Sequence, residues 1–207
     1  MSEGDGGWDG FGHADRIILD MNGMQPAAWI MWDIVDKHKD SDFRDPYGNY
    51  REANTTCSYT ESLWGVGVAD HDTETLVLTG KYYMFGQFTK YIEPGDTIIA
   101  SSDRTLAAYN KQTGDIKIVV SNSSSSDVNY EFDLSAFTSV GTDVREIRSD
   151  RSGSEQWAEI TGEAELSGKT LSAPAKAGTV TTFVIDGEGE TNYASITGGF
   201  DELCIGE

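Results

Sequence analysis

Residues 81–99 read KYYMFGQFTKYIEPGDTII, and this stretch marks a change in the kind of structure that the chain forms. Aromatic and aliphatic side chains at Tyr82, Phe85, Phe88 and Ile92 recur at helical spacing, which predicts an amphipathic helix over 81–92. The Pro-Gly pair that follows ends a helix, because proline cannot continue the backbone hydrogen bonding. We therefore place a boundary between two unlike parts of the chain at residue 92.

Downstream of this boundary the chain alternates between short β-type runs and turn-forming residues. Turn chemistry such as NKQTGD and NSSSSD separates these runs, which is typical of an antiparallel sandwich. The seven runs are TIIASS (97–102), TLAAYN (105–110), DIKIVVSN (115–122), VNYEFDLS (128–135), DVREIRS (143–149), QWAEIT (156–161) and TVTTFVID (179–186). We predict a β-sandwich over 93–186, followed by a tail or linker over 187–207, which is rich in glycine and glutamate.

Upstream of the boundary the pattern is that of an α/β repeat. Residues 10–22 have the spacing of a helix with one buried face, and Pro26 ends it. The continuous apolar run AAWIMW over 27–32 suits a strand buried on both faces, as in a parallel sheet. Residues 36–60 are polar and predict a long surface loop. Residues 1–92 thus resemble part of a barrel, since two βα units cannot close one.

The composition excludes several classes of partner. The formal net charge of -20 repels nucleic acid phosphates and anionic membranes, whereas a neutral sugar is compatible with it. A strongly acidic surface also increases solubility, and we prefer this explanation of the charge to an acidic binding site. The start MSEGDGG is no signal peptide, and no apolar run is long enough to span a membrane. Cys57 and Cys204 have no metal-binding spacing, and whether they form a disulfide stays open.

Four groups of residues, in order along the chain, resemble glycoside hydrolase family 30, and most closely its endo-β-1,6-galactanase branch. They are SEGDGGW (2–8); AWIMWD (28–33); LWGV (63–66) with KYYMFGQFTKYIEPG (81–95); and TLAAY (105–109) with VTTFVI (180–185). The resemblance implies an α/β plus all-β fold: the last two βα units of a (β/α)8 barrel in residues 1–92, then an antiparallel β-sandwich in residues 93–186.

The resemblance also implies a site and a reaction. Glu3 matches the nucleophile of a retaining glycosidase that acts on β-linked galactan or a related β-glycan, while no residue here matches the acid/base glutamate. Trp32, Asp33, Trp8 and Asp5 are the expected sugar contacts, because they would lie at the end of the barrel where sites form. We expect no cofactor and no metal. The expected partners are a polysaccharide or oligosaccharide and the missing N-terminal part of the barrel, in an extracellular setting.

A chain with one catalytic carboxylate is expected to be inactive by itself, since the transition state needs both groups and their pocket. The alternative is a non-catalytic β-sandwich module that binds carbohydrate or has a structural role. Barrel strands with an Asn-Glu pair, encoded upstream of Met1 in the same reading frame, would favour the enzyme.

Overall fold

The computed structural model describes residues 10–31, 34–39, 65–70, 74–99, 101, 104–150 and 153–193. Within these ranges the chain has two helices and twelve strands. The helices are α1 (Gly10–Gly23) and α3 (Gly80–Thr89). The strands are β1 (Val35–Lys39), β2 (Gly67–Asp70), β3 (Thr75–Leu78), β4 (Thr97–Ile99), β5 (Thr105–Tyr109), β6 (Ile116–Asn122), β7 (Val128–Asp133), β8 (Val144–Asp150), β9 (Ala158–Ile160), β10 (Glu165–Ser167), β11 (Thr170–Ala175) and β12 (Thr179–Ile185).

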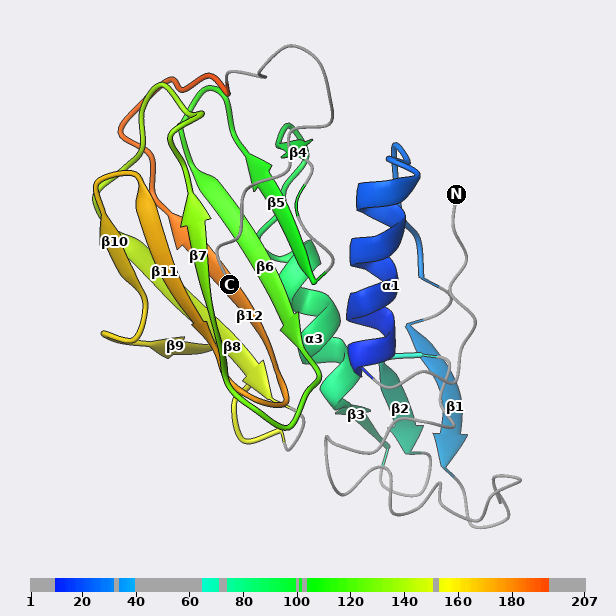
Figure 1. Cartoon of the computed structure of the whole chain (residues 1–207). Helices are drawn as coiled ribbons and strands as arrows, with labels where there is room; N and C mark the ends of the chain where they lie inside the picture. The colour runs from blue at the N-terminus through cyan, green and yellow to red at the C-terminus, as the bar shows by residue number, and fades with distance from the viewer. Residues whose placement is uncertain are drawn as a thin grey trace.

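The strands β4 to β12 form two sheets that lie face to face, and we call them the stacked sheets (Figure 1). One has six strands in the order β4-β5-β6-β12-β8-β9, and the other has three in the order β10-β11-β7. All neighbouring strands in both sheets are antiparallel. The last strand, β12, pairs along its whole length with β6 and β8, so it closes the centre of the larger sheet.

The space between the stacked sheets holds the larger apolar core. Side chains alternate across a strand, so Ile116, Ile118 and Val120 of β6 point inward together. They contact residues of the smaller sheet and of the loop that follows β7. The fully buried rings of this core include Phe132, Phe137 and Phe183. At about 1.5–3 kcal/mol for each large apolar side chain, this burial is the main source of stability for the two sheets.

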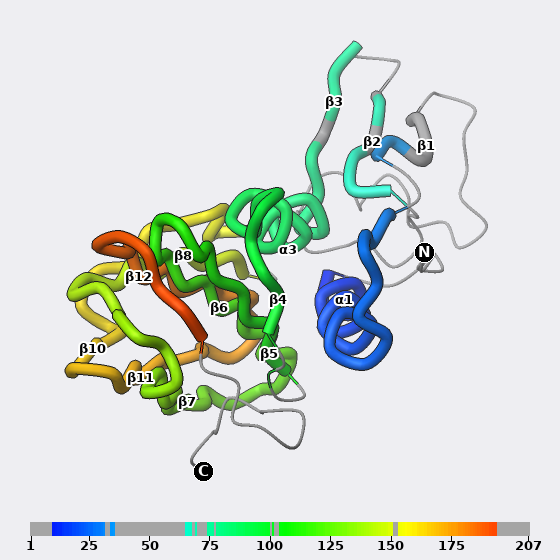
Figure 2. The backbone as a smooth tube through the Cα atoms, turned by 90° about the horizontal axis from the view of Figure 1, so that it is seen from above, coloured from blue at the N-terminus to red at the C-terminus, as the bar shows by residue number. Residues whose placement is uncertain are grey.

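The helices α1 and α3 pack side by side on the opposite face of the six-stranded sheet, as Figure 2 shows from above. A second apolar cluster joins the helices to the sheet. Its buried members are Phe11, Ala14, Ile17, Ile18, Met84, Phe88, Leu106, Val119 and Val180. These residues lie on both sides of the predicted boundary at residue 92. The part of the chain before this boundary, which we call the helical part, therefore shares one core with the six-stranded sheet.

Polar contacts fix α3 on the larger sheet. The buried Gln87 side chain donates to the Ser149 hydroxyl at 2.8 Å and accepts from the Thr182 hydroxyl at 2.6 Å. The Trp157 indole N–H donates to the backbone carbonyl of Tyr83 at 2.8 Å, and its ring lies against the backbone of Gly86. Buried polar groups that are all paired in this way specify one orientation of the helix.

The third sheet has the order β1-β2-β3 and lies on the far side of the helices from the stacked sheets (Figure 2). The strands β1 and β2 are parallel, and β2 and β3 are antiparallel. Glu74, which directly precedes β3, has a positive φ of 53°. The two helices therefore lie between the six-stranded sheet and the sheet β1-β2-β3.

Both predicted helices are confirmed, as are strands in all seven runs predicted after residue 97. The hairpin of β10 and β11 was not predicted. Its strands are short, Gly168 turns between them with a φ of 60°, and Pro174 weakens the strand signal. The alternating burial of Leu171, Ala173 and Ala175 is the signal that could have found β11.

The predicted strand over 27–32 is wrong for the described residues 27–31, which form no named strand. Ile30, with 54% of its surface exposed, makes only an isolated bridge. The chain turns at Gln25, which has a φ of 48°, and Trp29 is held against α1 by a hydrogen bond to Asp20. The parallel pairing lies further along, in β1, which overlaps the start of the segment predicted as a loop over 36–60.

The structure also differs from the prediction at residues 187–193, which pack onto the stacked sheets. The Gly187 amide donates to Asp115, and Thr191 is fully buried with its hydroxyl bonded to the carbonyl of Ser139. Tyr193 forms a β-bridge with Phe137 and contacts its ring. The few apolar residues in this segment gave no strand pattern, because its anchoring comes from backbone amides and hydroxyls.

Candidate functional site

The five residues that the sequence places in the site lie outside the described residues. They are Glu3, Asp5, Trp8, Trp32 and Asp33. Cys57 and Cys204 lie outside them as well. The structure does describe the residues that flank these two segments in the chain, and we call them the frame: Gly10 after the first segment, and Trp29 and Ile34 on either side of the second.

The first part of this frame is the beginning of α1, directly after the segment that contains Glu3. Gly10 starts the helix and lies against Met84 of α3, where a Cβ atom on Gly10 would be 2.2 Å from the sulfur. A larger residue at position 10 would require the Met84 side chain to move. Gly10 thus allows the start of α1 to lie close to α3.

The second part of the frame follows Asp33. The Ile34 carbonyl accepts hydrogen bonds from the amides of Val66 and Gly67, at 3.1 and 3.0 Å. The Val66 carbonyl in turn accepts from both the amide and the hydroxyl of Thr79, at 3.0 and 2.7 Å. Thr79 directly precedes α3, so the start of β1, the start of β2 and the start of α3 are joined by one short hydrogen-bond network.

Trp29 lies just before the segment with Trp32 and Asp33, and α1 holds it in place. Its indole N–H donates to the Asp20 carboxylate at 3.0 Å, and Arg16 pairs with the same carboxylate at 2.9 Å. The half-buried Trp29 ring lies 6.0 Å from the ring of Phe85, centroid to centroid. One turn of α1 thus positions the chain that leads to the predicted sugar contacts.

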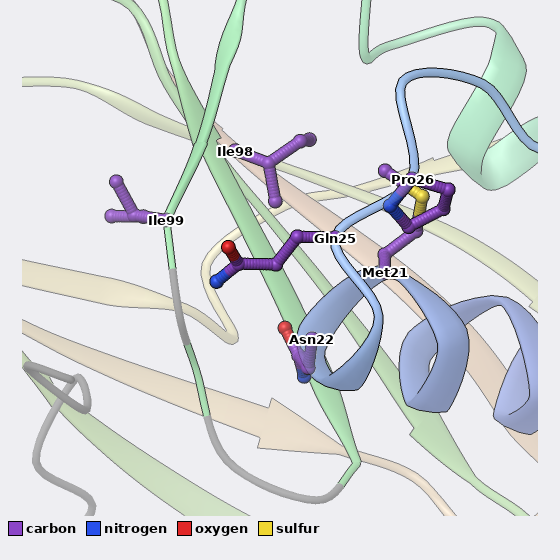
Figure 3. Close-up of a pocket in the computed structure, with 6 residues that line it drawn as sticks. All are labelled: Met21, Asn22, Gln25, Pro26, Ile98 and Ile99. Carbon is purple, nitrogen blue, oxygen red and sulfur yellow. The ribbon is translucent and has the colours of Figure 1, made fainter.

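Two adjoining hollows open between the end of α1 and the larger sheet. The smaller, of about 240 Å³, is lined by Met21, Asn22, Gln25, Pro26, Ile98 and Ile99 (Figure 3). The larger, of about 470 Å³, shares Met21 and Ile98 with it and extends past Trp29 and Phe85. Sequence reasoning did not predict these hollows, because they form only where residues about 75 positions apart meet.

A cluster of charged residues is centred on Arg148 of β8, the strand next to the edge strand β9 of the larger sheet. Arg148, only 4% exposed, pairs with Glu155 at 2.6 Å, Glu163 at 3.1 Å and Glu146 at 3.3 Å. Burial raises the pKa of Glu146, and one oxygen of its carboxyl has no hydrogen-bond partner. Burial also acts to raise the pKa of Glu163, but hydrogen bonds from Arg148 and Lys176 outweigh it and lower that pKa. The arrangement is a charge-paired structural cluster.

Among the described residues no three His, Cys, Asp or Glu side chains are grouped so that they could hold a metal ion. Neither described helix is long and apolar enough to cross a membrane.

Comparison with known proteins shows one informative relative in sequence. The chain is 26% identical over 189 residues to an endo-β-1,6-galactanase of Hypocrea rufa, and the match covers 89% of this chain. It covers 34% of the galactanase, so the chain spans about a third of the length of the curated relative that it matches. No family model matches the chain.

Solved structures agree on the fold. The catalytic domain of the GH30 xylanase C from Talaromyces cellulolyticus superposes with a TM-score of 0.57 and 17% identity, covering 85% of this chain and 34% of that one. A GH30 endoxylanase from Clostridium papyrosolvens gives a TM-score of 0.56 and 17% identity, with 90% and 41% covered. The resemblance that the motifs predict is therefore confirmed: the chain is similar in sequence to an endo-β-1,6-galactanase and in fold to part of the enzymes of glycoside hydrolase family 30.

Proposed function

We propose that this chain is the C-terminal part of a retaining glycoside hydrolase of family 30 that cleaves β-linked galactan or a related β-glycan. The observation that carries the proposal is the match to the galactanase, which runs over 189 residues and 89% of the chain. A match of that extent includes both the helical layer and the stacked sheets, so it concerns the whole arrangement and not a single motif.

In this proposal the helical part is the end of a (β/α)8 barrel, and the stacked sheets are the β-sandwich that follows it. The parallel pairing of β1 with β2, and the packing of the two helices against each other, support this interpretation. The core that α1 and α3 share with the larger sheet supports it too, because a sandwich fixed in this way would brace the barrel.

Glu3 would be the attacking carboxylate. It would form a covalent bond to the anomeric carbon while a second carboxylic acid gives its proton to the departing glycosidic oxygen. Water, deprotonated by that second group, would then release the sugar from Glu3 with its original configuration. The two carboxyl groups of such enzymes lie ~5–5.5 Å apart, and the second one would come from the part of the barrel that this chain lacks.

The remaining predicted site residues would bind the sugar. Trp32 would stack on a pyranose ring, since aromatic faces cover the apolar C–H face of a sugar. Asp33 and Asp5 would accept hydrogen bonds from sugar hydroxyls and Trp8 would help to close the site, because loops at this end of a barrel carry specificity. The frame of Gly10 and Ile34 supports the proposal, since it anchors one end of each segment.

The partners follow from the same proposal. A neutral polysaccharide or oligosaccharide suits a chain with a formal net charge of -20, which repels polyanions. Extracellular action would fit a polymeric substrate. The rest of the barrel would cover the exposed apolar side chains Leu19, Ile34 and Leu76 of the helical part, which are 62%, 70% and 55% exposed.

The experiment compares the chain alone with a longer form that includes the genomic coding sequence preceding Met1. We expect no release of galactose oligomers from β-1,6-galactan by the chain alone, and hydrolysis with retained anomeric configuration, followed by NMR, in the longer form. Glu3→Gln should abolish that hydrolysis. Robust turnover by the chain alone, or an inverted product, would contradict the proposal.

A non-catalytic carbohydrate-binding or structural module is the second candidate. It is favoured by the closed core of the stacked sheets, whose buried members all lie between Ile99 and Ile185. Such a module would bind oligosaccharides without cleaving them in any form of the protein, and Glu3→Gln would change nothing.

A further inference from the structure

We propose that the two hollows at the C-terminal end of α1 bind a pyranose unit of a neutral glycan, at a site separate from the predicted catalytic end. Ligand pockets commonly have ~300–1,000 Å³, and the two adjoining hollows together fall in this range. The proposal uses only described residues and goes beyond the hydrolytic function, on which it does not depend.

The smaller hollow combines carboxamides with an apolar wall. Gln25 reaches from the end of α1 toward β4, where Ile98 and Ile99 lie (Figure 3). Its carboxamide makes no hydrogen bond to any described residue, so it is available as both donor and acceptor. Asn22 stands beside it and is fixed by its bond to the Thr105 carbonyl at 3.0 Å. Hydroxyl groups of a sugar need this mixture of donors and acceptors.

The backbone of Gln25 also points to a role beyond folding. Its φ of 48° is in the left-handed region, which costs a residue with a Cβ atom of order 1 kcal/mol and is common at ligand-binding positions. Glycine or asparagine would occupy this conformation at lower cost. The long carboxamide is thus kept at a position where the backbone favours a smaller residue.

The larger hollow supplies the aromatic surface. Trp29 and Phe85 line it, and the Trp29 N–H is already bonded to Asp20, so the ring is oriented by a contact at its edge. A sugar ring placed on these side chains would bury its C–H face while its hydroxyls reach the carboxamides. Met21 and Ile98 line both hollows and make them continuous.

The charges of the lining residues, and the place of the hollows along α1, indicate which kind of ligand would bind and where. The six residues of the smaller hollow carry no charge, and the charged residues that line the larger hollow are the acids Glu93 and Asp96, so the two hollows together disfavour an anion. The helix α1 has 14 residues, so at 1.5 Å per residue the hollow is roughly 20 Å along the helix from Gly10, where the segment with Glu3 ends. A glycan held in the smaller hollow would lie away from the start of α1, where the segment with Glu3 ends.

The test is a titration of the ¹⁵N-labelled chain with methyl β-galactopyranoside and with β-1,6-galactobiose, followed by two-dimensional NMR. We expect saturable shifts of the Gln25 side-chain amide, the Trp29 indole and the backbone amides of 97–99, with a dissociation constant on the order of 1 mM. Gln25→Gly, which keeps the backbone conformation, should weaken binding about tenfold. Gln25→Asn, with a shorter carboxamide, should give a smaller loss.

The matched control is Asn129→Ala, which removes an exposed carboxamide from β7 in the other sheet and should leave the affinity unchanged. Glu3→Gln should not change it either, so a failure of the catalytic proposal is distinguishable. No saturable shift, shifts confined to residues outside the two hollows, or equal affinity of the Gln25→Gly variant would overturn the proposal.

Discussion

The connection between α3 and the stacked sheets depends on a buried ion pair, and breaking it should have a large effect. The Lys117 ammonium of β6 lies 2.6 Å from the Asp96 carboxylate, and the two side chains are only 6% and 0% exposed. The same carboxylate accepts from the amide of Glu93 at 2.9 Å and from Asn110 at 3.2 Å. Four groups thus converge where the chain leaves the helical layer.

Asp96→Ala would leave the Lys117 charge buried with only Glu93 nearby, at 3.8 Å and on a 68% exposed side chain. Leaving one member of a buried pair unpaired costs about 3–5 kcal/mol. For a domain of this size each 1 kcal/mol lowers the melting temperature by about 2–4 °C, so we expect a fall of roughly 6–20 °C. The double variant Asp96→Ala with Lys117→Met should lose less stability than Asp96→Ala alone, because no unpaired charge remains.

The matched control is an exposed pair of similar geometry. Arg145 and Asp186 are 2.9 Å apart, with side chains 47% and 52% exposed, and Asp186→Ala should cost no more than about 1 kcal/mol. Urea denaturation followed by circular dichroism measures all of these variants. If Asp96→Ala and Asp186→Ala differ by less than about 1 kcal/mol, the argument from burial is refuted.

Three further predictions concern packing and pH. Gly86→Val should lower stability by about 1–3 kcal/mol, because a Cβ there would be 2.3 Å from the Trp157 ring, whereas Gly23→Ala, with nothing within 4 Å, should be nearly neutral in thermal denaturation. Phe183→Ala should cost about 3–5 kcal/mol in urea denaturation, since the ring is fully buried in the larger core; a cost under about 1 kcal/mol would contradict this. Because burial raises the pKa of Glu146 in the folded chain, its contribution to stability is present at acidic pH and is lost as the pH rises through that value. Glu146→Gln should therefore lose less stability than the parent as the pH rises above the ordinary range of a glutamate pKa, and an unchanged pH profile would argue against a buried carboxyl.

Much of the fold could be predicted from local patterns. The helix over 81–92 and its Pro-Gly stop correspond to α3 and the turn into β4, because helical spacing and proline act within a few residues. The seven strand runs after residue 97 were predictable for the same reason, since β-branched runs and turns alternate there. How β12 inserts between β6 and β8 was not predictable, because strand order depends on contacts between distant segments.

The misplaced strand over 27–32 shows where composition misleads. The run AAWIMW is apolar enough for a buried strand, yet Ala27, Ala28 and Ile30 are exposed in this structure and Trp29 is bound to α1. An apolar run fits a buried strand only where neighbouring strands cover it. The five predicted site residues rest on family resemblance. The hollows beside Gln25 could not be foreseen, because their walls come from segments far apart in the sequence, among them α1, α3 and β4.

The central claim, that Glu3 is the attacking carboxylate of a retaining glycosidase, is tested most directly by trapping the covalent intermediate. The longer form of the protein would be treated with an activated 2-deoxy-2-fluoro β-galactoside, and the labelled peptide would be identified by mass spectrometry. The account predicts a single fluorosugar on the peptide that contains Glu3, and none after Glu3→Gln. A label on another carboxylate, or hydrolysis of β-1,6-galactan that survives Glu3→Gln, would contradict it.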